Sequence, residues 1–357
     1  MPTIGLRLDS FFSQTFLKLF FQIAFFKLPL LLLFIFIFQN PNPSFIMGYS
    51  NWSDDAYSHL KSKRANASRD DIFVNNKKGA ASPRMSPLNL KFRESRDSEA
   101  HPESLAIGVF LDVTGSMGRI PEVLVREKLG KLMNTLITHG IAHPQLLFGA
   151  IGDHISDRHP LQIGQFESGT DELDQWLTEI YIEGGGGGQV MESYTLAWLF
   201  AARHTSIDCF EKRRQKGFVF TIGDEAAWDT ISTDHLKSLM GYAQADSVTD
   251  KELLAEAERT YHVFHIHVNE ASYKNDPRVL GYWKNILGER LIILNDHAAI
   301  AETIATTVAV IHGIDAKQVL AAFDNKTANT VSEALVNINK GGASSKAGTN
   351  KKGIFKF

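Results

Sequence analysis

The chain has 357 residues, enough for one large domain with flanking segments or at most for two domains. Hydrophobic residues make up 44% of it and charged residues 22%, and the net charge of -3 excludes a general electrostatic attraction to nucleic acid or to anionic membranes. Cys209 is the only cysteine, which excludes an intramolecular disulfide and a cysteine-based metal cluster.

Residues 1–46 form a hydrophobic segment that holds 11 of the 24 phenylalanines. Within it, residues 19–38 are almost continuously apolar and long enough for a membrane-spanning helix. Three interpretations are open: a signal anchor through 19–38, a cleaved signal peptide, or a true start of translation at Met47. No small-residue cleavage pattern follows the apolar run, and an ordinary polar sequence begins at Met47. We therefore expect a cytoplasmic protein starting at Met47, with a membrane-anchored one, if residues 1–46 are retained, as the alternative.

Residues 47–103 are rich in Ser, Asn, Lys and Arg and contain few aliphatic side chains. No sustained hydrophobic period runs through them, which is typical of a segment that cannot bury enough apolar surface to order itself. We expect a mobile or loosely docked polar arm, with one short helix at about 54–63.

Strand and helix patterns alternate through residues 104–313. Short apolar runs predict strands at 104–112, 145–152, 161–163, 217–223, 260–268 and 290–294. Amphipathic patterns predict helices from about 121 onward and at 171–180, 190–204, 233–245, 251–259 and 298–312. Such alternation indicates βαβ crossovers, so we expect a Rossmann-like three-layer αβα sandwich around an open, mainly parallel sheet.

Two further segments follow this domain. The pattern of residues 314–339 predicts a helical extension, with helices at 316–323 and 330–338. Residues 340–357 are rich in Gly, Ser and Lys and are expected to form a flexible tail.

Oxygen-bearing side chains follow two of the predicted strands. Asp112 ends the first strand, Thr114 and Ser116 follow it at +2 and +4, and Asp224 comes directly after the strand at 217–223. The carboxyl ends of parallel strands share one edge of the sheet, where ligands bind in such folds. Because Mg²⁺ prefers hard oxygen ligands, we expect these residues to hold Mg²⁺, with Asp224 acting through water.

A glycine-rich loop lies between these residues in the sequence. Five consecutive glycines at 184–188 precede Gln189, Glu192 and Ser193, and any of these three side chains could supply one more oxygen. The glycines let backbone pass close to an ion or change shape when a partner binds; a plain flexible connector is the alternative. The run lacks the Gly-Lys-Ser/Thr continuation of a phosphate-binding loop, so no nucleotide is expected.

The segment 104–313 resembles the von Willebrand factor type A (VWA) family with its metal-ion-dependent adhesion site (MIDAS). The family motif Asp-x-Ser-x-Ser reads here Asp112-x-Thr114-x-Ser116, and Asp224 occupies the place of the family's later Asp. A Thr expected from the second loop is absent, which leaves Gln189, Ser193 or Glu192 for that contact. The resemblance implies a non-enzymatic protein-binding domain in which a partner's Asp or Glu completes the coordination of Mg²⁺, or of Mn²⁺ or Ca²⁺.

Two alternatives compete with this interpretation. Asp112 and Asp224 could simply cap the helices that follow them. The segment from Phe110 to Ser116 also resembles the first motif of haloacid-dehalogenase-type phosphatases, and Asp224 with Asp229 fits their acidic motif. Asp112 would then be a phosphoryl acceptor. That family generally places a second Asp at +2 as general acid, whereas Thr114 cannot transfer a proton at neutral pH.

Histidines His265 and His267 alternate along one predicted strand and therefore share a face, a spacing that can bind Zn²⁺. No third convergent ligand is evident, so we favour packing with satisfied hydrogen bonds.

Overall fold

The computed structural model describes residues 50–342 except 89, 186–187, 189 and 244–245. The expectations for residues 1–46, for a start at Met47, for Gln189 and for nearly all of the tail therefore lie outside the described residues. Among the residues described, no helix is both long enough and apolar enough to span a bilayer.

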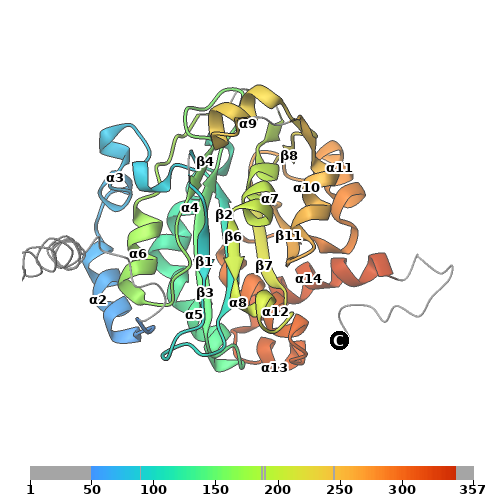
Figure 1. Ribbon diagram of the computed structural model, residues 1–357. Helices are drawn as coiled ribbons and strands as arrows, with labels where there is room; N and C mark the ends of the chain where they lie inside the picture. Colours follow the sequence, from blue (N-terminus) through green and yellow to red (C-terminus); the bar gives the residue numbers. More distant parts are fainter. Residues whose placement is uncertain (1–49, 89, 186–187, 189, 244–245, 343–357) are drawn as a thin grey trace, which may run out of the picture. The chain divides into compact units, whose positions relative to one another are not determined.

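A six-stranded sheet forms the centre of the domain (Figure 1). From one edge to the other its strands are β12 (Leu291–Leu294), β11 (Tyr261–Val268), β7 (Gly217–Gly223), β2 (Leu105–Asp112), β3 (Pro144–Ile151) and β4 (Leu161–Ile163). Neighbouring strands pair in parallel except β4, which runs antiparallel to β3 at the edge. Every residue of β2, β3 and β7 is buried, because helices cover both faces.

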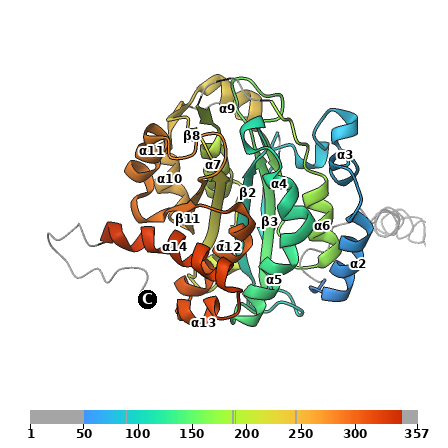
Figure 2. The same cartoon turned by 180° about the vertical axis from the view of Figure 1, so that it is seen from behind.

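Helices lie on both faces of this sheet, so the expected three-layer α/β sandwich is confirmed. One face carries α4 (Ile120–Val123), α5 (Leu129–Thr138) and α12 (Ile300–Ile311), which are seen in front of the sheet in Figure 2. The other face carries α7 (Tyr194–Arg203), α10 (Asp250–Ala257) and α11 (Pro277–Leu287), and α7 lies in front of the sheet in Figure 1. A π-helical turn, η4 (Leu124–Lys128), joins α4 to α5. Helix α9 (Thr233–Met240) lies above the carboxyl edge of the sheet, and α6 (Thr170–Thr178) packs beside β3.

Two-residue strands shape the loops at the carboxyl edge. Strand β5 (Met191–Glu192) pairs in parallel with β8 (Ala226–Ala227), and β9 (Thr230–Ile231) pairs antiparallel with β10 (Val248–Thr249). The helix predicted at 190–204 consequently begins only at Tyr194, because the residues before it are held in the β5–β8 pair.

The prediction of a mobile arm at 47–103 is wrong for the described part of that segment. It forms α2 (Asp54–Arg64), α3 (Arg69–Ile72), two 3-10 turns and β1 (Arg93–Ser95), which pairs with β6 (Thr205–Ile207). Tyr57, Ile72, Phe73 and Met85 are buried in the main hydrophobic core. These apolar side chains are spaced without a helical or strand period, so the sequence pattern did not reveal that they bury together.

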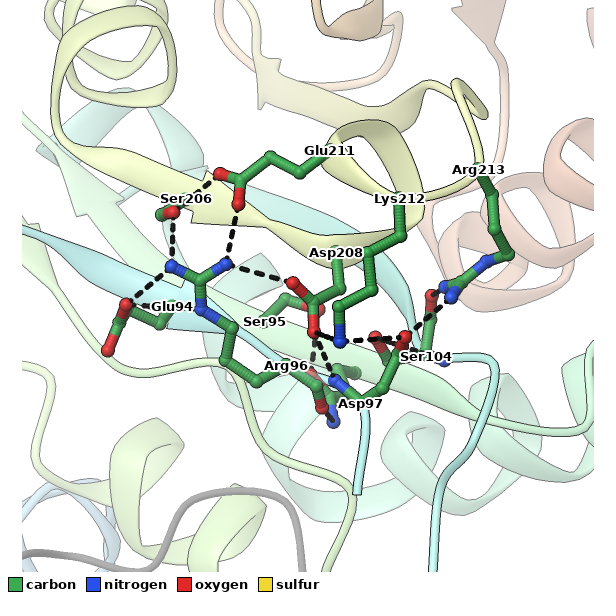
Figure 3. A network of polar contacts seen from close by, with 11 residues as sticks. Glu94, Ser95, Arg96, Asp97, Ser104, Ser206, Asp208, Glu211, Lys212 and Arg213 are labelled. Atoms are coloured by element: carbon green, nitrogen blue, oxygen red, sulfur yellow. Dashed lines mark hydrogen bonds and ion pairs between the residues drawn. The ribbon is translucent and has the colours of Figure 1, made fainter. Parts of the chain in front are cut away.

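Charged side chains fasten the end of this segment to the domain (Figure 3). Arg96 pairs with Asp208 at 2.9 Å and with Glu211 at 2.7 Å, and Arg213 pairs with Asp97 at 2.7 Å. The Asp97 carboxylate also accepts hydrogen bonds from the backbone and hydroxyl of Ser104, the residue just before β2. The segment is therefore anchored just after β1 to residues 208–213 and to the start of β2.

The helical extension is present as α13 (Ala316–Leu320) and α14 (Asn325–Gly342). Helix α14 packs against β12 and α12, with Val331, Ala334 and Leu335 buried. It covers the β12 edge of the sheet on the face seen in Figure 2.

Candidate metal centre

The loop after β2 folds around the Asp112 carboxylate. Asp112 is fully buried, and its Oδ1 accepts hydrogen bonds from the backbone N–H of Thr114 at 2.9 Å and from the Thr114 hydroxyl at 2.6 Å. The Ser116 hydroxyl lies 3.2 Å from the Thr114 hydroxyl. A 3-10 turn, η3 (Gly115–Met117), brings both hydroxyls back beside the carboxylate, so three oxygen-bearing side chains gather at one point.

The loop after β7 meets this group directly. Ser116 Oγ donates to Asp224 Oδ1 at 2.7 Å, and the other oxygen of Asp224 accepts from the backbone N–H of Tyr273 at 3.1 Å. Because β2 and β7 are adjacent parallel strands, their carboxyl ends bring these loops together although Ser116 and Asp224 are 108 positions apart. The four expected ligands therefore converge, as the motif at two strand ends predicted.

The glycine loop packs against the first loop through its backbone. Gly115 N–H donates to the Gly185 carbonyl at 2.7 Å, and Gly184 N–H donates to the Val113 carbonyl at 3.3 Å. A Cβ on Gly115 would lie 3.2 Å from the carbonyl oxygens of both Gly184 and Gly185, so a side chain there would push the loops apart. Gly184 also has a φ of 64°, in the region that favours glycine. The backbone of Gly184 and Gly185 is therefore held against the loop that follows β2.

Tyr194 at the start of α7 holds the second oxygen of Asp112. Its hydroxyl donates to Asp112 Oδ2 at 2.6 Å and is buried. A Cβ on Gly223 would lie 1.8 Å from this hydroxyl, so glycine at the end of β7 makes room for the contact. The sequence analysis did not single out Tyr194, because a Tyr that opens an apolar helix resembles an ordinary core residue.

His265 supports this tyrosine by packing. Its ring stacks on Trp283 with centroids 3.6 Å apart, lies edge-on to Tyr194 at 4.9 Å, and its Nδ1 lies 2.9 Å from the Thr221 hydroxyl. Burial lowers the pKa of both His265 and His267, so both rings are neutral. His265 is thus packed as expected, but the satisfied hydrogen bonds expected for both rings are only partly formed. The Nε2 of His265 and both ring nitrogens of the buried His267 have no hydrogen-bond partner among the described residues.

Two further buried acids lie beside the centre. Glu192 in β5 is 2% exposed and Glu225, next to Asp224, is 5% exposed. Burial, with added repulsion from Asp112 and other carboxylates, raises the pKa of Glu192 to about 11 and that of Glu225 to about 8. Burial likewise raises the pKa of Asp112 to about 7. Without a cation, Glu192 and Glu225 are therefore mainly protonated at neutral pH, whereas Asp112 is protonated only in part.

The described candidates for the second-loop ligand differ in their surroundings. The Ser193 hydroxyl accepts from the backbone N–H of His154 at 2.8 Å and lies 2.7 Å from the ring Nδ1 of the same residue. Ser193 is thus engaged with the loop after β3. Glu192 instead interacts electrostatically with Asp112 and Glu225, and its Oε2 has no hydrogen-bond partner. Of the two, Glu192 has the freer oxygen, and sequence analysis had named it only as an alternative.

The donor set fits a hard divalent cation. All candidate donors are oxygens, and both Glu192 Oε2 and Glu225 Oε2 are buried acceptors without a hydrogen-bond donor. Such orphaned buried acceptors are costly in a folded protein, and a cation would satisfy them. A separate acidic and histidine group, Glu270, Asp296 and His297, lies in more exposed loops. There Asp296 already pairs with Lys326 at 2.6 Å, so the group lacks the buried free oxygens of the main centre.

Replacing Glu192 with Gln should stabilise the metal-free protein at pH 8 by about 2 kcal/mol and have little effect at pH 5. The folded-state pKa of Glu192 is raised, so folding takes up a proton. The stability of the wild type is therefore highest below the pKa that Glu192 has in the unfolded chain, and it falls as the pH rises above that value. Gln takes up no proton on folding, so the variant does not lose stability in this way. Urea denaturation in EDTA at both pH values measures this difference. The exposed Glu99→Gln is the control, and an equal effect of Glu192→Gln at both pH values would contradict the assignment.

Comparison with known proteins identifies no family. No family model and no curated protein sequence matches the chain. Among solved structures, the pilus adhesin SpaC from Lactobacillus rhamnosus GG, in its open conformation, aligns at 8% identity and a TM-score of 0.38, covering 60% of this chain and 31% of that one. Proximal thread matrix protein 1 from the mussel byssus aligns at 10% identity and a TM-score of 0.38, covering 61% and 48%. The chain thus spans less than half the length of these structures. Fold and geometry define an α/β protein with an oxygen-donor centre at the carboxyl edge of its sheet.

Proposed function

We propose that residues 104–313 form a VWA-like domain that binds Mg²⁺ and, through it, an acidic side chain of a protein partner. Asp112, Thr114 and Ser116 would hold the ion, with Asp224 in the outer shell and Glu192 as the acid from the second loop. Mn²⁺ or Ca²⁺ could replace Mg²⁺, because both take oxygen ligands. The observation that supports this proposal most directly is the 2.7 Å hydrogen bond between Ser116 and Asp224, which joins the loops of two adjacent strands at one point.

The bound ion would supply a positive charge in a buried setting, where a carboxylate from a partner is attracted strongly. The chain's own residues fix the site for that contact. Thr114 and Tyr194 orient the two oxygens of Asp112, and the backbone of Tyr273 orients Asp224. This orientation keeps the donors in place before a partner arrives and so lowers the cost of binding.

The phosphatase alternative receives less support from these contacts. A phosphatase of that family generally has an Asp as general acid at +2, whereas Thr114 stands there, donates its hydroxyl to Asp112 Oδ1 and cannot transfer a proton at neutral pH. Asp229, the second acid of the phosphatase motif, is exposed.

Immobilised protein should capture a partner from a cell lysate in Mg²⁺ and release it in EDTA. Converting the carboxylates of the captured protein to amides should abolish its recapture, because the ion then lacks its last ligand. Capture that persists in EDTA, or survives amidation, would exclude the proposed mode. Turnover of p-nitrophenyl phosphate that requires Mg²⁺ and Asp112 would instead support the phosphatase.

A further inference from the structure

Two histidines face each other at the amino edge of the sheet. His143 directly precedes β3, and His101 lies shortly before β2, the strand beside β3. The Nδ1 atoms of the two rings are 3.4 Å apart, and the rings meet edge to face with centroids 5.5 Å apart. His101 is 5% exposed and His143 is half-buried. The backbone N–H of Leu105 donates to the His143 carbonyl at 2.9 Å, so the two segments are tied together beside the rings.

The second nitrogen of His101 determines which atom of that ring carries the proton. Its Nε2 lies 2.9 Å from the carbonyl oxygen of Ser50, and a carbonyl can only accept, so the proton of the neutral ring is on Nε2. The Nδ1 of His101 then presents a lone pair to His143. Histidines that bind metals are typically held in this way, with one ring N–H donated to a backbone carbonyl and the other nitrogen left for the ion.

The separation of the two Nδ1 atoms fits a shared metal ion. Zn²⁺ binds imidazole nitrogen at about 2.0–2.1 Å, so two nitrogen ligands of a tetrahedral ion lie about 3.3–3.4 Å apart. The observed distance of 3.4 Å agrees with this spacing. It also exceeds the roughly 2.7–3.2 Å of most protein hydrogen bonds, so the contact between the rings is weak without an ion.

Acidic side chains lie beside the pair. Glu103 and Asp97 both interact electrostatically with His143. The Asp97 carboxylate is already engaged, because it accepts from Ser104 and pairs with Arg213 (Figure 3). Glu103 is exposed, and its carboxylate takes part in no hydrogen bond or ion pair within the described part of the chain. It is therefore free to turn toward the rings, and a carboxylate oxygen is a usual Zn²⁺ ligand.

The turn that carries His101 is closed by its own hydrogen bonds. The Ser98 N–H donates to the His101 carbonyl at 3.0 Å, and the His101 N–H donates back to the Ser98 carbonyl at 3.2 Å. Farther out, the N–H and hydroxyl of Ser104 donate to Asp97 Oδ1 at 3.1 and 2.8 Å. A ligand that is already held in position loses little conformational freedom on binding.

We propose that His101 and His143 bind Zn²⁺ through their Nδ1 atoms, with Glu103 as the third protein ligand and water as the fourth. In the metal-free pair the proton of His143 is on Nδ1, because the facing Nδ1 of His101 has none and two lone pairs would repel. Binding moves this proton to Nε2 of His143, so both rings become Nε2–H tautomers and no proton is released. The ion then joins the N-terminal segment to the start of β3.

This site is independent of the oxygen-donor centre. The histidines lie before β2 and the centre lies after it, and an eight-residue strand is roughly 23 Å long. The two sites also differ in chemistry, because imidazole nitrogen suits Zn²⁺ whereas carboxylate and hydroxyl oxygens suit Mg²⁺. Failure of one proposal therefore leaves the other standing.

Zinc titration of the untagged, metal-free full chain tests the site. An excess of Mg²⁺ is kept present, so that the oxygen-donor centre is supplied with its own ion. Isothermal titration calorimetry should show one Zn²⁺ bound per chain. His101→Gln and His143→Gln should each weaken binding by at least about 100-fold, because outer partners of a metal alone are worth 10- to 100-fold. Glu103→Gln should weaken it about 10-fold.

Three control variants should leave the affinity for Zn²⁺ unchanged. His59→Gln removes an exposed histidine of α2, and Glu99→Gln removes an exposed acid close to His101 in the chain. His297→Gln alters the separate group of Glu270, Asp296 and His297. Loss of binding in His297→Gln, with wild-type affinity in His143→Gln, would place the ion in that group and overturn the proposal.

Nitrogen-15 NMR of the histidine rings tests the wild type directly, so the result does not depend on the folding of a variant. Saturating Zn²⁺ should move the His143 proton from Nδ1 to Nε2 and leave the His101 proton on Nε2. Unchanged tautomers would show that the two rings only share a proton and would overturn the site. The absence of Zn²⁺ binding in excess Mg²⁺ would overturn it equally.

Discussion

Asp112→Asn should weaken Mg²⁺ binding by at least about 100-fold, because it removes the charged donor at the centre of the site. The substitution keeps the shape of the side chain, and the new amide can still accept from Thr114 and face the Tyr194 hydroxyl. The fold is therefore expected to persist. Isothermal titration calorimetry with MgCl₂ measures the affinity, and circular dichroism checks the fold.

The control for this substitution is Asp171→Asn, which removes the same charge from an exposed position in α6. It should leave the affinity for Mg²⁺ unchanged. Wild-type affinity in Asp112→Asn would show that the cation, if bound, lies elsewhere. Loss of binding in both variants would show that total charge, not the site, governs it.

The Asp112→Asn substitution should also change the free energy of unfolding. Ligands that bind only the folded state stabilise it, by about 2.7 kcal/mol at a concentration 100 times the Kd. Wild-type protein should gain this stability in Mg²⁺, whereas Asp112→Asn should not. The metal-free variant should also be more stable than the metal-free wild type at pH 8, because burial disfavours the ionised carboxylate at this position.

Phe73→Ala should destabilise the protein by about 3–5 kcal/mol, because it leaves a cavity in a filled core. Phe73 follows α3 and is 0% exposed. Its effect measures how firmly the N-terminal segment is part of the domain. Chemical denaturation at a pH where the protein folds reversibly gives the difference in free energy of unfolding.

Phe92→Ala provides a matched comparison within the same segment, since Phe92 is 57% exposed. It should change the stability by less than about 0.5 kcal/mol. If Phe73→Ala were equally mild, the segment would not contribute to the core, and the mobile arm expected from its composition would be correct after all.

The buried acids suggest a physical trade-off between folding and binding. Glu192, Glu225 and Asp112 repel one another once ionised, and burial adds to the cost of their charge. Natural proteins often accept such destabilisation where function requires it. A cation at the centre would offset the repulsion, so binding and stability are expected to rise together.

Periodicity was sufficient to locate most of the sheet. The strands predicted at 161–163 and 217–223 coincide with β4 and β7, and the other four differ from the observed bounds by a residue or so. Buried parallel strands are short apolar runs set off by turns, which a local pattern can reveal. Helix α11 was missed although Asp276 caps it and Val279, Trp283 and Leu287 form a buried stripe, a signal that was present in the sequence.

The α/β class and the four oxygen-bearing residues at two strand ends could be predicted from the residues alone, because both depend on local runs and on the rule that parallel strands share an edge. The contacts of Tyr194 and Glu192 with Asp112 and the burial of Phe73 became evident only in the folded chain. Those contacts join residues far apart in the chain. Their cause is the packing of α7 and of the N-terminal segment against the sheet, which no local pattern of residues encodes.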